Sequence, residues 1–339
     1  MIVKDNRRIL WLDSLKGIAI LFMVMRHILS NSYGDYDFCL QQWHTMGANY
    51  VYASILWKFI YSFHMPLLFF ISGWLFYKPY MIYNLKNCLG MMKKRFARLV
   101  IPYFTTGILL YLYKDVFGYW FLCVLFVTNV IVLSCLMLLH YFKLKRGIWH
   151  LLFFGIAYIV IYAYKLKVNY MQDYTFQLVT CYPAFVLGLL IKKYPCLSGL
   201  IKNKYLTLAY LTIYLSVFIY LNYHMLGARY LEPIMILSII LFFYILFQKA
   251  PNESWQGPEG RFLVEIGKYS MEIYILHIFF IIRIPAIGNY ITGLNDLPTS
   301  LAFQTVYSLI LAFIAIKLSI WLSKFLAGSE LLNKLLFGK

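Results

Sequence analysis

Charged residues are scarce in this sequence, and acidic residues are scarcer still. Asp, Glu, Lys and Arg make up 13% of the 339 positions, and Asp and Glu together number only 13. A soluble domain has about 25% charged residues, so this composition excludes an ordinary soluble protein. The alternating short strands of a membrane barrel are also missing. Because 62% of the residues are hydrophobic, the chain is predicted to be an all-α polytopic membrane protein.

Cysteine is also sparse, and it lacks the spacing that metal sites require. The six cysteines contain no CxxC or CxxH pair, which excludes the common zinc-binding signatures. We therefore expect neither a disulfide framework nor a bound metal.

The charge that is present is mostly positive, and the formal net charge is +18. In a soluble protein this excess would suggest nucleic acid as a partner. In a membrane protein it is explained by basic cytoplasmic loops. We therefore expect membrane lipids, and no nucleic acid, around these side chains.

Ten hydrophobic stretches approach the length of about 20 residues that a helix needs to cross a bilayer. They cover residues 11–31, 52–77, 99–113, 118–140, 147–164, 175–192, 205–222, 230–248, 269–287 and 300–323. With the N-terminus in the cytoplasm, most of the 31 basic residues fall on the cytoplasmic side. The other side receives Arg26, Lys58, Lys114, Lys165, Lys167, Arg229 and Arg283. This asymmetry predicts ten spans with both termini cytoplasmic.

We expect a single membrane domain over residues 1–339, with one peripheral helix. Apolar residues recur at helical spacing over residues 85–99, and basic residues stand between them. This pattern predicts an interfacial amphipathic helix on the cytoplasmic face. Residues 249–264 are the longest polar stretch between hydrophobic segments, and they are predicted to be a connection.

Lys16 and His27 are the most informative pair in the sequence. They lie eleven residues apart in the first hydrophobic stretch, which puts them on one helix face about 16 Å apart. An ionisable residue deep in a membrane indicates a functional site, and histidine takes and gives protons near neutral pH. Taken alone, Lys16 also fits a side chain that reaches lipid phosphates. Asp13 precedes Lys16 by three residues and is positioned to pair with it.

Two more histidines are predicted at a similar depth. His64 lies about 21 Å before Lys78, and His277 lies about 13 Å after Lys268, by helical rise. The three histidines are therefore expected to meet in the middle or outer half of the bilayer. Taken singly, His64 and His277 fit a hydrogen bond between helices equally well.

Other polar residues in the spans are weaker candidates. Ser72, together with Gly73, is expected to allow close approach of helices and to line a substrate path. Glu272 is a candidate to balance a cation, although it lies about 140° around the helix from His277. The arginines of Arg95-Phe96-Ala97-Arg98, with Lys93 and Lys94 before them, suit phosphate groups. They suit anionic lipid as well.

Several of these segments resemble the acyltransferase-3 family of integral membrane acyltransferases. The resemblance is carried, in family order, by LDSLKGIAILFMVMRHI, FHMPLLFFISGWLF, KKRFARLVIPYF, WFLCVLF and GKYSMEIYILH. The first segment has the family pattern of a basic residue, ten positions and a histidine. Lys16 stands where many members have arginine, and the segment is most similar to the fucose 4-O-acetyltransferase-like branch. A lysine keeps the charge but not the planar fork of a guanidinium.

The resemblance implies an O-acyltransferase, most often an O-acetyltransferase, of the bacterial cytoplasmic (inner) membrane. The donor would be cytoplasmic acyl-CoA, commonly acetyl-CoA, and the acceptor a hydroxyl of an extracytoplasmic or lipid-linked glycan. His27 would be a general base or a transient acyl carrier, assisted by Lys16, His64 and His277. Arg95, Arg98 and Lys94, with Asp13 near the entrance, would hold the donor. Trp120, Ser72 and Glu272 would contact the acceptor.

Two other functions fit the same composition. Buried histidine and glutamate in ten helices also suit a proton-coupled transporter or a flippase. Against this, the sequence has no internal repeat and no matched pair of helices broken by glycine or proline. The other alternative is an acyltransferase whose acceptor is cytoplasmic.

Overall fold

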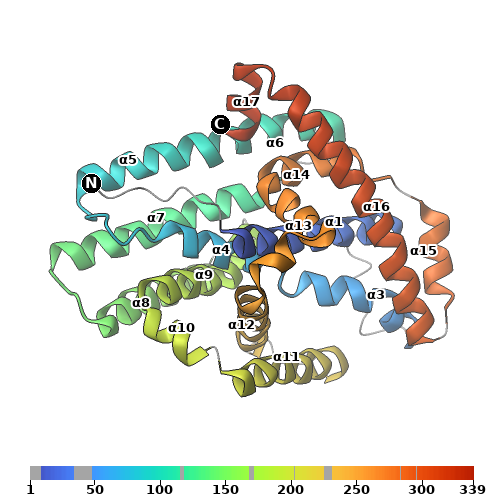
Figure 1. The fold of residues 1–339 in the computed structure, drawn as a ribbon, viewed down its shortest axis with the longest axis horizontal. Helices are drawn as coiled ribbons and strands as arrows, with labels where there is room; N and C mark the ends of the chain where they lie inside the picture. Colours follow the sequence, from blue (N-terminus) through green and yellow to red (C-terminus); the bar gives the residue numbers. More distant parts are fainter. Residues whose placement is uncertain are drawn as a thin grey trace. The chain divides into compact units, whose positions relative to one another are not determined.

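The computed structural model describes residues 9–33, 48–114, 118–167, 172–201, 203–224, 231–282, 284–294 and 296–339. Helix is the only regular secondary structure in these residues (Figure 1). The all-α prediction is therefore confirmed. The described chain forms two compact units, one of residues 1–65 and 242–325 and one of residues 66–241 and 326–339.

The first unit is built around the N-terminal helix. Its elements are α1 (Leu10–Tyr33), α3 (Ala48–Tyr61), η3 (Asn252–Trp255), α13 (Pro258–Lys268), α14 (Ser270–Leu276), η4 (His277–Phe279), α15 (Pro285–Thr292) and α16 (Leu297–Leu326). The start of α4 and the end of α12 complete it. The helix α1 confirms the predicted helix over 11–31, and α13 is its main packing partner.

Two glycines bring α1 and α13 into backbone contact. A Cβ placed on Gly17 would lie 2.0 Å from the carbonyl oxygen of Leu263, and one on Gly267 would lie 1.8 Å from that of Asp13. Neither position has room for a side chain, since these distances are far below van der Waals contact. The predicted connection over residues 249–264 is not irregular, because it contains η3 and the start of α13. Pro258 at the first turn and Glu259 after it suit a helix N-terminus.

The predicted helix over 52–77 is interrupted at its centre. The helix α3 ends at Tyr61, and α4 (His64–Phe76) begins three residues later. Pro66 lies in the first turn of α4, where a missing N–H is tolerated. As a result, His64 stands at the start of α4, within the candidate membrane span Ser54–Phe76.

The predicted helix over 269–287 is also wrong as one continuous helix. The helix α14 ends at Leu276, a 3₁₀ turn covers His277–Phe279, and α15 begins only at Pro285. Proline removes an N–H donor and disfavours helical backbone before it, which explains the late restart. The change to 3₁₀ geometry occurs at His277 itself.

The second unit contains the remaining helices. They are most of α4, then α5 (Leu85–Arg95), η1 (Phe96–Val100), α6 (Ile101–Lys114), α7 (Trp120–Tyr141), α8 (Gly147–Lys167), α9 (Gln172–Lys193), α10 (Pro195–Ile201), α11 (Lys204–His224), α12 (Glu232–Lys249) and α17 (Glu330–Phe337). The segment η1 is a π-helix that joins α5 to α6 without a break. The helix α17 packs on α6, where Thr105 Oγ1 donates to the carbonyl of Leu335 at 2.6 Å.

Within the described residues, seven helices are long and apolar enough to cross a membrane. They cover Ser54–Phe76, Leu85–Tyr113, Trp120–Tyr141, Gly147–Lys167, Tyr174–Lys193, Glu232–Lys249 and Leu297–Leu326. Two shorter apolar helices are Tyr205–Leu221 and Ser270–Phe279. A multi-pass membrane protein is thus supported, while the number ten and the cytoplasmic termini stay predictions.

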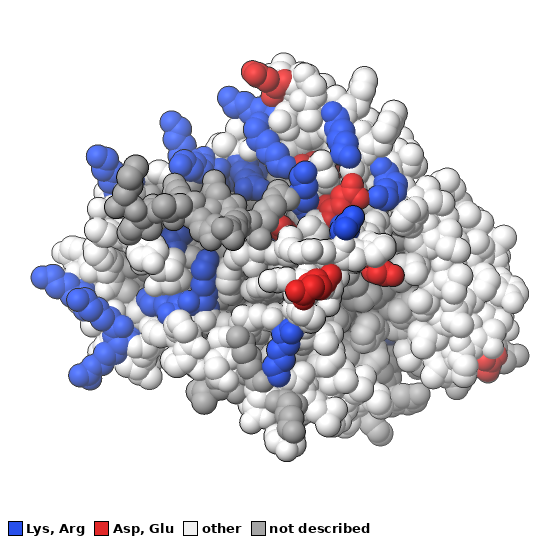
Figure 2. All heavy atoms as spheres, viewed as in Figure 1, with Lys and Arg blue, Asp and Glu red and all other residues white. Residues whose placement is uncertain are grey.

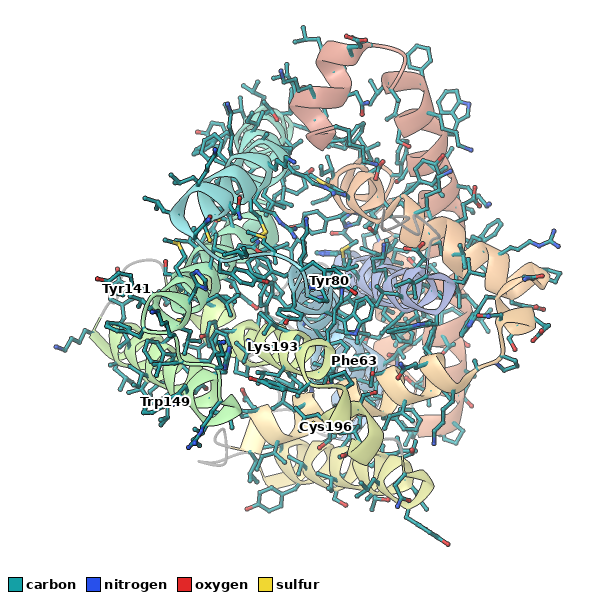
Figure 3. All side chains as sticks on the ribbon, turned by 60° about the vertical axis from the view of Figure 1, so that its left-hand side comes forward. Phe63, Tyr80, Tyr141, Trp149, Lys193 and Cys196 are labelled. Carbon is teal, nitrogen blue, oxygen red and sulfur yellow. The ribbon has the colours of Figure 1, made fainter. Side chains whose placement is uncertain are left out.

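The surface of the second unit suits lipid contact. Along α8, Ile156, Ile159 and Val160 are all exposed. Tyr141 at the end of α7 and Trp149 at the start of α8 are exposed as well (Figure 3). Exposed aliphatic side chains between aromatic ones are typical of a helix that faces a bilayer.

Candidate functional site

The N-terminal helix carries the predicted ion pair. Lys16 Nζ lies 2.5 Å from Asp13 Oδ1, and both side chains are largely buried. The predicted pairing of these two residues is therefore confirmed. Since Gly267 contacts the backbone of Asp13, α13 fixes the position of the pair from the other side.

His27 lies against His277. The two imidazole rings are 5.1 Å apart between centroids and tilted by 52°. His27 is half-buried, and His277 is buried. The expectation that these helices bring their histidines together is confirmed for this pair.

The backbone orients His277. Its Nδ1 lies 2.9 Å from the carbonyl oxygen of Ile273, which accepts only from a protonated ring nitrogen. Nδ1 therefore carries a hydrogen. The backbone thus fixes the orientation of the ring that lies next to His27.

Arg26 is the residue that the sequence analysis missed. Its Nη1 lies 3.3 Å from Nε2 and 3.4 Å from Nδ1 of His27. Its guanidinium carbon lies 5.2 Å from the centroid of the Trp57 ring and 5.0 Å from that of Tyr61. The side chain is buried, at 6% exposure, although the charge pattern of the loops assigns Arg26 to the outer membrane surface. A cation inside the apolar segment ILFMVMRHIL was the signal that identifies it.

Hydrogen bonds hold the Trp57 ring in place beside Arg26. Trp57 Nε1 donates to Ser30 Oγ at 2.6 Å, and Ser30 Oγ donates to the carbonyl of Arg26 at 3.1 Å. Trp57 also stacks on Tyr61, with ring centroids 4.8 Å apart. Cation–π contacts of this kind become stronger when they are removed from water. Arg26 is therefore a fixed positive charge beside His27.

His64 belongs to the same unit and adjoins this cluster through Tyr61. The His64 and Tyr61 ring centroids are 6.3 Å apart. His64 Nδ1 donates to the carbonyl of Ile60 at 2.8 Å. This carbonyl lies at the end of α3, where the last carbonyl groups of the helix have no partner within the helix. Glu272 is buried on α14 in this unit, and its role stays a prediction.

The residues predicted to bind the acyl-CoA donor lie in the second unit. The guanidinium carbon of Arg95 is 5.6 Å from the centroid of the Phe76 ring, and Arg95 is half-buried. Lys94 and Arg98 are exposed. Arg98 lies in the π-helix, and its backbone contacts Gly338, whose φ of +63° favours glycine. Figure 2 shows that basic side chains predominate over acidic ones on the face in view.

Two residues of this unit are predicted to contact the acceptor substrate, and both are partly accessible. Ser72 on α4 and Trp120 at the start of α7 are both half-buried. Next to Ser72, a Cβ on Gly73 would lie 1.9 Å from the carbonyl oxygen of Phe185 on α9. The expected close helix approach at Gly73 is therefore confirmed. Contact of Ser72 or Trp120 with an acceptor stays a prediction.

A further basic group at the end of α9 has no counterpart among the predicted site residues. Lys192 Nζ lies 4.1 Å from the centroid of the Trp74 ring. Lys193, labelled in Figure 3, contacts His150 Nε2 through its Nζ. Tyr194 Oη lies 3.1 Å from Nδ1 of the same histidine. These side chains add positive charge to the unit that carries Arg95 and Arg98.

Comparison with known proteins gives one match. The model of the acyltransferase-3 family, described as an acyltransferase domain, matches residues 9–317. No match was found among curated proteins or among solved structures. The matched range contains every candidate site residue described above.

Proposed function

The chain belongs to the acyltransferase-3 family and is a membrane acyltransferase, and on this premise we propose that it is an O-acetyltransferase. The donor is acetyl-CoA from the cytoplasm. The acceptor is a hydroxyl of an extracytoplasmic or lipid-linked glycan, and the enzyme resides in a bacterial inner membrane. The more specific resemblance to the fucose 4-O-acetyltransferase-like branch favours a sugar hydroxyl.

One observation carries the proposal, namely the contact of His27 with His277 and with Arg26. The rings of the two histidines lie 5.1 Å apart, and Arg26 Nη1 lies 3.3 Å from His27 Nε2. An acyl transfer needs a base for the hydroxyl proton and a positive charge for the developing oxyanion. A half-buried histidine beside a buried arginine supplies both in one place.

In the proposed reaction, His27 removes the proton from the acceptor hydroxyl. The hydroxyl oxygen attacks the thioester carbonyl, so that a C–O bond forms and a tetrahedral oxyanion develops near Arg26. The C–S bond then breaks, and the proton held by His27 passes to the leaving sulfur of CoA. No net proton is taken up or released. His277 orients the ring of His27 through their contact.

The donor is proposed to bind in the second unit. Arg95, Arg98 and Lys94 provide the positive charge for CoA phosphates. In the first unit, Lys16, paired with Asp13, stands in this proposal at the cytoplasmic mouth of the channel. Trp120 provides an aromatic face for a sugar ring.

Acetyl transfer in vesicles tests this function. Inverted vesicles from cells that express the protein would receive acetyl-CoA with a labelled acetyl group, and their glycans would be isolated afterwards. We expect label in an alkali-labile ester of a glycan, and none in vesicles that carry the His27→Gln variant. Label that stays in CoA, with the wild-type protein correctly inserted, contradicts the proposal.

A further inference from the structure

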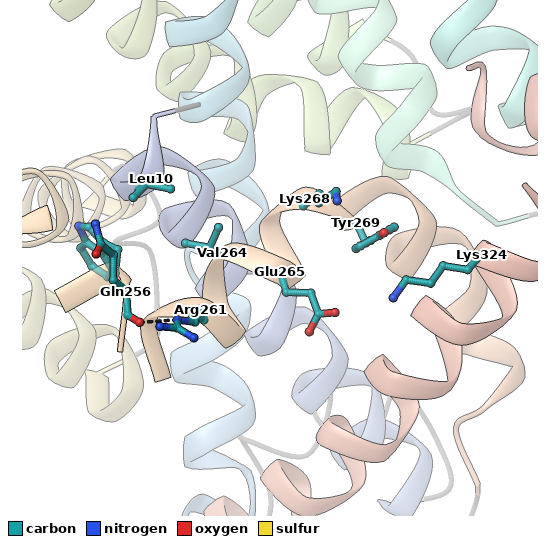
Figure 4. A pocket seen from close by; sticks show the side chains of 9 residues that line it. Leu10, Gln256, Arg261, Val264, Glu265, Lys268, Tyr269 and Lys324 are labelled. Carbon is teal, nitrogen blue, oxygen red and sulfur yellow. Dashed lines mark hydrogen bonds between the residues drawn. The ribbon is translucent and has the colours of Figure 1, made fainter. Parts of the chain in front are cut away.

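A second candidate site lies in the first unit, outside the histidine cluster. A pocket of about 470 Å³ opens between α13, η3 and the end of α16 (Figure 4). Its lining consists of Leu10, Trp255, Gln256, Arg261, Val264, Glu265, Lys268, Tyr269 and Lys324. This volume is within the range of small-ligand sites, which is about 300–1,000 Å³.

The lining carries an excess of positive charge. Arg261, Lys268 and Lys324 are basic, and Glu265 is the one acidic residue of the lining. The carboxylate of Glu265 pairs with Lys317 Nζ at 2.8 Å. Because this pair offsets the negative charge, the three basic residues define the charge that a ligand meets.

The positions of these cations are defined by their neighbours. Lys268 Nζ and Lys324 Nζ lie 5.2 and 5.5 Å from the centroid of the Tyr269 ring. Arg261 Nε donates to the carbonyl of Gln256 at 2.5 Å, drawn as a dashed line in Figure 4. This bond holds the guanidinium at the pocket and keeps its two terminal nitrogens as donors for a ligand.

Trp255 forms part of the pocket wall. Trp255 is only 9% exposed, and its ring stacks on Phe247 with centroids 5.1 Å apart. Trp255 therefore contributes an apolar wall, and the three cations of the lining point to a ligand with several acceptor oxygens.

We propose that this pocket binds the phosphate groups of an anionic ligand, independently of Arg95 and Arg98. A phosphate monoester or diphosphate combines multiple acceptor oxygens with concentrated negative charge, and arginine and lysine are its usual protein partners. The ligand is either a soluble phosphate compound or the headgroup of an anionic lipid. Basic pockets beside membrane helices bind lipid headgroups by the same chemistry.

Calorimetry on the purified full-length protein in neutral detergent tests the proposal. The soluble probe is inorganic pyrophosphate, and the lipid probe is short-chain phosphatidylglycerol. We expect one probe to bind protein that carries Arg98→Ala, and its affinity to fall on the order of tenfold when Lys268→Gln or Lys324→Gln is added. Binding of pyrophosphate identifies a soluble source, and binding of phosphatidylglycerol alone identifies a lipid.

Three control variants make the outcome specific. Lys324→Arg keeps the charge and should retain binding, which separates loss of charge from loss of fold. Lys86→Ala removes an exposed lysine of α5 and should leave the affinity unchanged. Arg98→Ala serves as the background for every titration, because pyrophosphate would otherwise also bind at the proposed donor site. The inference is overturned if neither probe binds in this background, or if the glutamine variants keep its full affinity.

Discussion

His27 and His277 lie at opposite ends of the matched region, and their rings meet at a centroid distance of 5.1 Å. This contact joins α1 to the short turn after α14, and Arg26 adjoins it from the preceding position of α1. Two histidine rings and a buried cation are thus gathered within one unit of the chain, where the proposed mechanism requires them.

The glycine contact between α1 and α13 is expected to be essential for stability. Gly267→Ala would place a methyl group 1.8 Å from the carbonyl oxygen of Asp13, so the helices would have to separate. Overpacking of this kind typically costs about 1–3 kcal/mol. Thermal unfolding in detergent would measure the loss. Gly90→Ala is the matched control, since no atom lies within 4 Å of its added carbon; equal stability of both variants would contradict the packing described.

Removal of the buried cation should impair catalysis. Loss of one stabilising donor to an oxyanion typically lowers kcat by about 10²–10³-fold, and we expect such a decrease for Arg26→Ala. Arg26→Lys, which keeps the charge but not the planar contact with Trp57 and Tyr61, should be intermediate. Steady-state acetyl transfer would give kcat and KM separately. A change in KM alone would show that Arg26 only binds substrate. The control is Lys167→Ala, which removes an exposed lysine.

If Arg98 binds a phosphate of CoA as proposed, the Arg98→Ala variant should bind CoA more weakly. A charged hydrogen bond to phosphate contributes about 1.5–3 kcal/mol, which corresponds to roughly tenfold to a hundredfold in Kd. Titration calorimetry with free CoA would measure it. Lys86→Ala on the neighbouring α5 provides a comparison of equal charge change. Wild-type affinity in Arg98→Ala would assign the arginine to lipid contact.

Much of the fold follows from the sequence, because apolar length and charge asymmetry define membrane helices. The helix interruptions at Ser62 and after His277 could not be predicted from apolar length or charge. Hydropathy averages over a window, whereas these breaks depend on single residues such as Pro66 and Pro285. The helix α13 was missed because its residues are polar on one side, and only contact with Gly17 shows why it forms against α1.

For the site, the sequence predicted which residues take part better than it predicted which residues they contact. The pairing of Asp13 with Lys16 follows from helical spacing, and the structure confirms it. The charge pattern of the loops did not identify Arg26 as a buried side chain, because such a pattern carries no information on burial. The apolar segment around Arg26 is a local sign of burial, but its contacts with Trp57 and Tyr61, which are distant in sequence, could not be predicted from that segment.

Topology is expected to follow the charge asymmetry. With the N-terminus in the cytoplasm, the loop that contains Lys143, Lys145 and Arg146 is cytoplasmic. A Lys145→Cys variant in a background without other reactive cysteines should therefore resist an impermeant thiol reagent in intact cells. It should react once the cells are opened. Labelling in intact cells would reverse the proposed orientation of the enzyme.

The central claim is that His27 is the catalytic base, and the His27→Gln variant tests it most directly. Glutamine keeps a hydrogen-bonding side chain but does not take up a proton at neutral pH. We expect acetyl transfer to fall by about 10²–10⁴-fold, the usual contribution of a general base, while calorimetry shows unchanged affinity for CoA. Near-wild-type transfer by His27→Gln, with His277→Asn or His64→Gln inactive, would contradict the account and assign the base to another histidine.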